Sequence, residues 1–127
     1  MISETQQYSI ESVVNNLISH AGKQYEKLVA YLDYGEATYT FVYYLKSKGR
    51  YRRYDIFTAQ NKIETGKFFE RIYQELLRLE EDSFRRKVVT VIYDAHASKY
   101  RVEVDESPDF RLGYGFYLTL WIDRYLK

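Results

Sequence analysis

The sequence predicts an α+β fold in the order α-β-β-β-α-β-β-α, with helices packed on a five-stranded, mostly antiparallel sheet. Two observations lead to this fold class. The spacing of apolar residues changes along the chain between the helical period of 3.6 and the strand period of two. The expected strands also come in hairpin-connected groups instead of alternating singly with helices. At 127 residues, without a linker or an internal repeat, the chain is expected to form one domain over residues 1–127.

The first element is a helix that ends near Gly22. Its apolar residues recur at helical spacing and share one stripe. They are Ile10, Val13, Val14, Leu17 and Ile18. Ser9 is a suitable N-cap, although Ser3 or Thr5 would start the helix earlier. Gly22 can provide the left-handed residue that often ends a helix.

Three strands are expected next, over residues 28–33, 38–45 and 51–57. The second is a run of β-branched and aromatic residues, which suit a pleated surface. The turn segments Tyr34-Gly35-Glu36 and Ser47-Lys48-Gly49 separate the three strands. Because short turns join antiparallel neighbours, this part of the chain predicts a meander.

A second helix is expected from about Thr65 to Glu81. Its apolar stripe comprises Phe69, Ile72, Tyr73, Leu76 and Leu77, widened by Phe68 and Leu79. Two further strands follow over residues 87–93 and 100–105, joined by a turn. The last segment, from about Tyr114 to Leu126, is expected to be helical. Phe116, Leu120 and Trp121 are expected on one face of it, with Tyr117 and Ile122 at the margins.

Composition and charge exclude several classes of protein. Hydrophobic residues at 46% and charged residues at 29% exclude a disordered chain. The net charge of +1 gives no overall attraction to nucleic acid or to an anionic membrane. The absence of cysteine excludes a disulfide scaffold, a thiolate metal site and a cysteine nucleophile. With no secretory signal and no long apolar run, we expect a cytoplasmic location.

Residues able to carry catalysis are scarce. The two histidines, His20 and His96, are too few for the common metal sites. We interpret Asp94-Ala95-His96 as a solvated hairpin turn. Gly113-Tyr114-Gly115 lacks the third glycine of a dinucleotide loop, and no serine lies in a nucleophile-elbow pattern. We therefore expect neither an enzyme, nor a cofactor, nor a metal site.

Tyrosine is the most unusual feature of the composition, with 15 residues in the chain. Its ring packs on one side, while its hydroxyl meets water or a partner on the other. Since there is no catalytic set for these rings to serve, their number favours a domain that binds protein. Phe41, Tyr43 and Trp121 are attributed to the core instead of to recognition.

Five positive charges gather around the second turn, interleaved with tyrosines. They are Lys46, Lys48, Arg50, Arg52 and Arg53. Three interpretations remain open, and we prefer them in this order. The first is a solvated hairpin tip, where basic residues protect an edge strand from mispairing. The second is a contact with protein, and the third is a single-stranded nucleic-acid site with stacking aromatics.

Four acidic residues gather where the last strand ends, and they are Glu103, Asp105, Glu106 and Asp109. Such a surface can occupy the basic cleft of a nuclease by mimicking phosphates. It can equally be the polar face of an edge strand that runs into an acidic loop. Tyr114 and Tyr117 follow closely and are candidate aromatic anchors. These six are the expected partner-binding residues, with the basic cluster as the alternative patch.

Three segments resemble the YezG-type immunity proteins, small antitoxins that neutralise secreted bacterial toxins. Tyr39-Thr40-Phe41-Val42-Tyr43-Tyr44 resembles the family's aromatic second strand, and Tyr54-Asp55-Ile56 resembles the end of its third strand. Trp121-Ile122-Asp123-Arg124-Tyr125-Leu126 resembles its closing Trp-x-x-basic-Tyr-Leu segment. With the order of elements, the resemblance covers nearly the whole chain.

The resemblance implies a stoichiometric inhibitor without catalytic residues. Its partner would be a cognate toxin domain, nuclease-like or similar, whose active site or substrate approach it blocks. The expected assembly is a monomer in a 1:1 complex, without direct contact to nucleic acid or membrane. A type III secretion chaperone is the alternative, because it has the same order of elements. Such a chaperone is a homodimer that grips an effector segment, and it is typically strongly acidic, unlike this chain. A nucleic-acid-binding module ranks third and an enzyme last.

Overall fold

The computed structural model describes residues 4–22, 24–54, 62–81 and 85–127. It confirms the predicted fold class and the predicted order of elements. The helices are α1 (Glu4–Ala21), α2 (Lys62–Glu81) and α3 (Tyr114–Tyr125). The strands are β1 (Lys27–Gly35), β2 (Thr38–Ser47), β3 (Arg50–Tyr54), β4 (Lys87–Asp94) and β5 (Lys99–Asp105). The expectations about Ser3, residues 55–57 and Asp82 fall outside the described residues.

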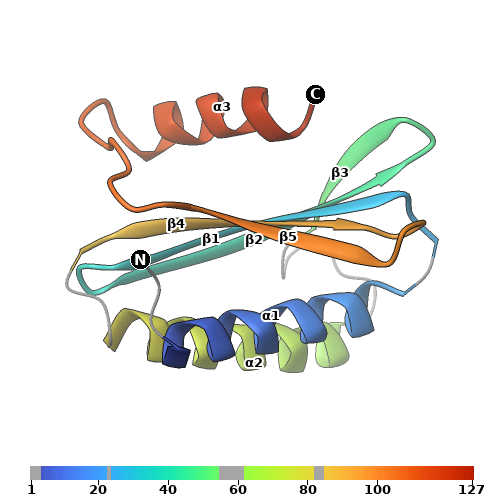
Figure 1. The fold of residues 1–127 in the computed structure, drawn as a ribbon, viewed down its shortest axis with the longest axis horizontal. Helices are drawn as coiled ribbons and strands as arrows, with labels where there is room; N and C mark the ends of the chain where they lie inside the picture. The colour runs from blue at the N-terminus through green and yellow to red at the C-terminus, as the bar shows by residue number, and fades with distance from the viewer. Residues whose placement is uncertain (1–3, 23, 55–61, 82–84) are drawn as a thin grey trace.

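The five strands form one antiparallel sheet in the order β3-β2-β1-β4-β5. The first three are joined by hairpins, as the predicted meander requires, and α2 carries the chain to the other side of β1. α1 and α2 lie side by side on one face of the sheet, and α3 covers the other (Figure 1). The sheet is therefore the middle of three layers, with β3 and β5 at its edges. Within the described ranges, no helix is long and apolar enough to cross a membrane.

β1 lies at the centre of the sheet and is covered on both faces. Leu28 and Leu32 belong to the core beneath α1 and α2, whereas Val29 and Tyr31 belong to the core beneath α3. Successive side chains of a strand point to opposite faces. A strand covered on both sides therefore has no face for polar residues. Every residue of β1 after Lys27 is buried, and Asp33 is the charged residue among them.

The helices on the first face differ from their predicted stripes in two details. α1 begins at Glu4, earlier than Ser9, which is buried inside the helix, so Ser9 is not the N-cap. In α2, Phe68 and Leu79 are fully buried, whereas Leu77 is 44% exposed. The reason is that α2 packs against α1 as well as against the sheet. Its buried stripe is therefore rotated from the one inferred from spacing alone.

Two-residue turns with positive φ at both positions join the first three strands. They are Glu36-Ala37, with φ of 53° and 61°, and Lys48-Gly49, with φ of 52° and 75°. Such turns match the right-handed twist of paired strands. The first turn lies later than predicted, and the Ala37 N–H donates to Glu80 of α2 at 3.1 Å. Gly22, with φ of 80°, adopts the left-handed conformation expected of it.

We predict that Gly35→Ala destabilises the protein. Gly35 ends β1 with φ of 117°, and a Cβ placed there would lie 2.5 Å from the Arg85 carbonyl oxygen and 2.6 Å from the Arg86 Cα. Backbone atoms cannot rotate aside as the tip of a side chain can. The substitution should therefore lower the free energy of unfolding by about 3 kcal/mol or more, as measured by urea denaturation.

Gly66→Ala is the matched control for this prediction. Gly66 lies inside α2, and no atom lies within 4 Å of a Cβ added there. Because alanine is the better helix former by about 1 kcal/mol, this variant should be more stable than the parent. Equal stability of the two alanine variants would contradict the close backbone approach at Gly35.

Candidate protein-binding surface

A buried ion pair lies beneath α3, on the face of the sheet away from α1 and α2. The Asp33 side chain is 0% exposed, and Arg86, just before β4, reaches it with two hydrogen bonds. Nε donates to Oδ1 at 2.7 Å and Nη2 donates to Oδ2 at 2.6 Å. The Tyr31 hydroxyl donates to the same Oδ2 at 3.0 Å. The bonds to Asp33 raise the pKa of the Arg86 guanidinium.

Aromatic rings connect this ion pair to α3 and to the loop before it. The Arg86 guanidinium lies over the Phe110 ring, 3.8 Å from its centroid. The Tyr31 ring makes edge contacts with Trp121 at 5.2 Å and with Tyr114 at 6.1 Å. Guanidinium–ring and edge-to-face contacts of this kind are favourable when they are shielded from water. The loop and the helix are therefore held by the same polar group.

The polar tips of the α3 aromatic residues also meet the sheet. The Trp121 indole N–H donates to the Thr90 hydroxyl at 2.8 Å, and both groups are buried. The Tyr117 hydroxyl donates to Asp105 Oδ2 at 2.8 Å, and burial with this bond raises the pKa of Tyr117. One aromatic face of α3 is thus fixed by hydrogen bonds as well as by packing.

A cleft of about 340 Å³ lies between α3 and the edge strand β5. Its walls carry Glu103 and Asp105 from β5, and Tyr117, Leu120 and Arg124 from α3. Of the six predicted partner-binding residues, the structure therefore brings three together here. Glu103 lies 3.6 Å from Arg101 and from Arg124, and accepts from the Tyr125 hydroxyl at 3.4 Å.

The other three predicted residues lie outside the walls of this cleft. Asp109 forms a two-bond ion pair with Arg111 in the exposed loop, which lowers the pKa of Asp109 to about 2. Glu106 is exposed and also has an interaction within the chain. Tyr114 is partly exposed, with its ring against Tyr31. Much of the acidic charge is therefore already matched within the molecule, which weakens it as a phosphate mimic.

The outer face of α3 corrects the predicted orientation of this helix. Phe116 and Leu120 do not share a face with Trp121. They are 49% and 53% exposed, and Leu112, in the turn before the helix, is 73% exposed. The sheet-facing side of α3 carries Trp121 and Tyr117, whose polar groups bond the sheet, with Leu118 and Ile122 packed on the same core. Phe116 and Leu120 form an apolar stripe on α3 that is left facing outward.

The five basic residues of the hairpin do not act as one patch. The Lys46 ammonium lies 5.5 Å above the Tyr51 ring. Arg53 faces α3, where its charge acts on Tyr114, and it has a further interaction of its own. Lys48, Arg50 and Arg52 are exposed, and none of them forms an ion pair with the described residues. β3 is an edge strand, as the first of the three interpretations requires.

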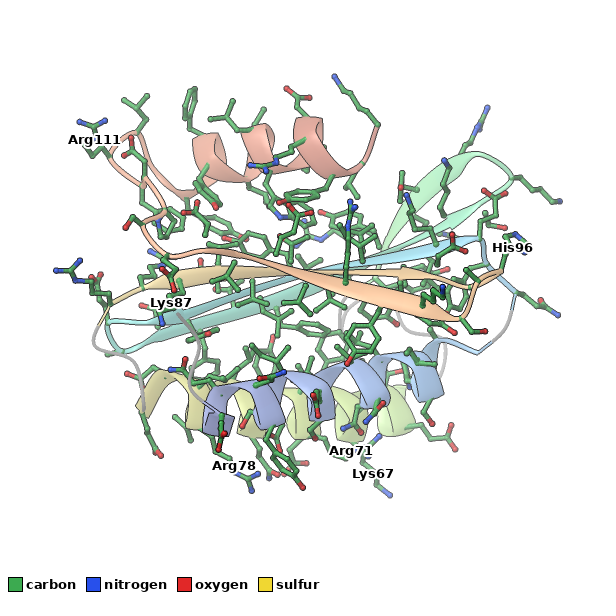
Figure 2. All side chains as sticks on the ribbon, viewed as in Figure 1. Lys67, Arg71, Arg78, Lys87, His96 and Arg111 are labelled. Carbon is green, nitrogen blue, oxygen red and sulfur yellow. The ribbon has the colours of Figure 1, made fainter. Side chains whose placement is uncertain are left out.

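The two histidines lie far from this surface. His96 is in the β4–β5 turn, where its backbone N–H donates to Asp94 Oδ1 at 3.0 Å, which confirms the predicted hairpin turn. Figure 2 places His96 and Arg111 toward opposite sides of the molecule. His20 stacks on Phe68 at 3.9 Å, and burial and the Arg71 charge lower its pKa. In the ranges that the structure covers, no group of three or more His, Cys, Asp or Glu residues could hold a metal.

Comparisons with known proteins add no relative. No protein-family model matches the sequence, and a search of curated proteins finds no match.

Sequence reasoning missed two parts of this surface. One is the Asp33–Arg86 pair, whose signal is an acidic residue inside a strand that is otherwise apolar. The other is the outward stripe on α3, whose two members, Phe116 and Leu120, are spaced by four residues. That spacing marks one face of a helix but does not say whether the face is inside or outside.

We predict that Arg86→Met destabilises the protein far more than Arg111→Met. Both arginines form two-bond pairs with an aspartate, but Asp33 is fully buried and Asp109 is exposed. Loss of Arg86 leaves a buried carboxylate without its countercharge and should cost about 3–5 kcal/mol. Loss of Arg111 should change stability little, because its pair with Asp109 is in solvent. Urea denaturation of both variants tests this, and similar losses would contradict a structural role for the buried pair.

We also predict that stability falls above pH 10. Burial raises the pKa of Tyr34 and of Tyr43 to about 12, and it raises that of Tyr31 further. The unfolded chain ionises near pH 10, whereas these hydroxyls stay protonated in the fold. Stability should therefore be intact below pH 10 and be lost as the pH rises through 12. Urea denaturation between pH 8 and 12 measures this.

Tyr34→Phe supplies the control for the alkaline loss. The Tyr34 hydroxyl is buried, and within the described part of the chain it neither donates nor accepts a hydrogen bond. Its removal should not lower stability at neutral pH, and it should make the decline above pH 10 shallower. A decline that keeps its full slope in this variant would mean that Tyr34 does not contribute.

Proposed function

We propose that this chain is an immunity protein that binds one cognate toxin domain in a 1:1 complex and blocks the toxin's active site or substrate access. The observation that carries the proposal is the outward apolar stripe of α3, beside a cleft with acidic walls. Exposed apolar side chains that are contiguous on a surface are characteristic of protein contacts. The proposed partner is a protein and not nucleic acid or membrane, and the proposed location is the cytoplasm.

α3 is held rigidly on the sheet, and this favours tight binding of a partner. Phe116 and Leu120 are carried by a helix whose inner face is fixed by Trp121 and Tyr117, and Leu112 lies in the turn just before that helix. A surface that is already ordered loses little conformational entropy when it binds. Apolar and aromatic anchors of this kind dominate interface energies, while charged residues around them set orientation and association rate.

In this proposal the acidic residues contribute less to the contact with the toxin than the sequence predicts. Glu103 and Asp105 accept bonds from α3 side chains, and Asp109 is paired with Arg111. We propose that Glu103 and Asp105 form the polar rim of the contact and that the α3 stripe is its centre. The resemblance to YezG-type immunity proteins supports a toxin as the partner.

We predict that co-expression of this protein restores growth to bacteria that express the product of the adjacent upstream gene. The double variant Phe116→Ser/Leu120→Ser should bind that product at least tenfold more weakly, which corresponds to about 1.4 kcal/mol or more. Growth rescue should fall accordingly. Isothermal titration calorimetry of the purified pair measures the change in affinity.

Leu77→Ser is the matched control, because Leu77 is an exposed leucine of α2 on the other face of the sheet. It should bind and rescue like the parent. If the upstream product is harmless, or stays toxic beside this protein, the proposal fails. If light scattering finds a homodimer that binds an extended segment of another protein, the chaperone alternative replaces it.

A further inference from the structure

β3 is an open edge of the sheet. Among the described strands it pairs with β2 alone, through residues Arg50–Tyr54. A strand with one free side presents backbone N–H and C=O groups that can pair with another extended chain. The hairpin of β2 and β3 projects beyond the helices, so its tip is accessible (Figure 1).

Two exposed arginines of β3, Arg50 and Arg52, lie on the same face of the strand. Arg52 lies opposite Leu45, whose side chain packs on the core of α1 and α2. Arg50 is two residues earlier and so points to the same face. Tyr51 lies opposite Lys46, and its ring packs with the core beneath α3. Arg50 and Arg52 therefore share one face of the open strand with Tyr54, and Tyr51 and Arg53 share the other.

Three cations of this hairpin, Lys48, Arg50 and Arg52, are not matched by an acidic partner within the described ranges. All three side chains are exposed. On the same hairpin, burial and the nearby charge of Glu26 raise the pKa of Tyr51. By contrast, Arg86, the arginine before β4, is paired with Asp33.

We propose that the outer edge of β3 binds an acidic polypeptide segment in an extended conformation, as a sixth strand of the sheet. The segment carries acidic residues at alternate positions, which face Arg50 and Arg52. Directly opposed residues on paired strands lie about 5 Å apart, within reach of carboxylate–guanidinium pairing. The residue between the two acids is apolar or aromatic, because it faces the side of Tyr51.

A polypeptide fits this edge better than a nucleic acid does. The free backbone groups of β3 can form a ladder with another peptide chain and not with a phosphate backbone. Nucleic-acid binding depends on many phosphate contacts, whereas the uncompensated charges here are three and the chain's net charge is +1. The surface is separate from the stripe on α3, and the inference stands whether or not the partner of α3 is a toxin.

The test uses the full chain and an eight-residue peptide of alternating glutamate and valine. Titration in low salt, followed by amide NMR, should shift the resonances of residues 48–54 first. A peptide of alternating lysine and valine should give no such shifts. The acidic peptide with methylated backbone nitrogens at alternate residues should bind at least tenfold more weakly, because it cannot complete the ladder.

The double variant Arg50→Glu/Arg52→Glu should bind the acidic peptide at least tenfold more weakly. Arg50→Gln/Arg52→Gln repeats the measurement with a milder change if the first variant folds poorly. Lys67→Glu/Arg71→Glu is the matched control, because it makes the same change in net charge on α2 (Figure 2). This control should keep most of the affinity.

Three results would overturn the inference. One is equal loss of binding in the Arg50/Arg52 and Lys67/Arg71 variants, which would mean a general charge effect. Another is undiminished binding of the backbone-methylated peptide, which would exclude strand addition. The third is binding of a ten-nucleotide thymidine strand at residues 48–54 under conditions where the acidic peptide fails to bind, which would assign the edge to nucleic acid.

Discussion

The buried carboxylate of Asp33 is the constraint on which the α3 side of the molecule depends. A charge in the central strand, covered on both faces, is tolerated only with a partner that satisfies both of its oxygens. Arg86 does this with two bonds, and Tyr31 adds a third. Arg86 then supports the Phe110 ring, and Tyr31 supports Trp121. The position of the loop and of α3 thus follows from the neutralisation of one side chain.

The same logic explains why the aromatic residues of α3 face as they do. The indole N–H of Trp121 and the hydroxyl of Tyr117 find acceptors on β4 and β5, at Thr90 and Asp105. Leu118 and Ile122 pack on the same core, whereas Phe116 and Leu120 remain exposed on the outer side. The tyrosine side chains on this side of the sheet therefore mainly hold α3 in place. The residues available to a partner are chiefly the exposed apolar ones.

The net charge is near zero, but charge is distributed unevenly over the surface. On the β5 side, acids and arginines pair with one another or with α3 hydroxyls, so that little charge remains unmatched. On the β3 side, Lys48, Arg50 and Arg52 have no ion pair within the described residues. The two edges of one sheet are thus electrostatically different. An apolar helix face and a cationic strand edge, carried on separate parts of the fold, are suited to different kinds of contact.

The fold class, the order of elements and the second hairpin turn were predictable from the sequence, because they depend on local periodicity and on turn residues such as Lys48 and Gly49. The sequence also grouped Glu103, Asp105 and Tyr117, which line one cleft. The packing of the elements was needed to know which side of α3 is buried and which charges are matched. Both depend on contacts between segments far apart in the chain, such as Asp33 with Arg86 and Trp121 with Thr90. Periodicity identifies a face of a helix, but what covers that face is settled by the elements that pack against it.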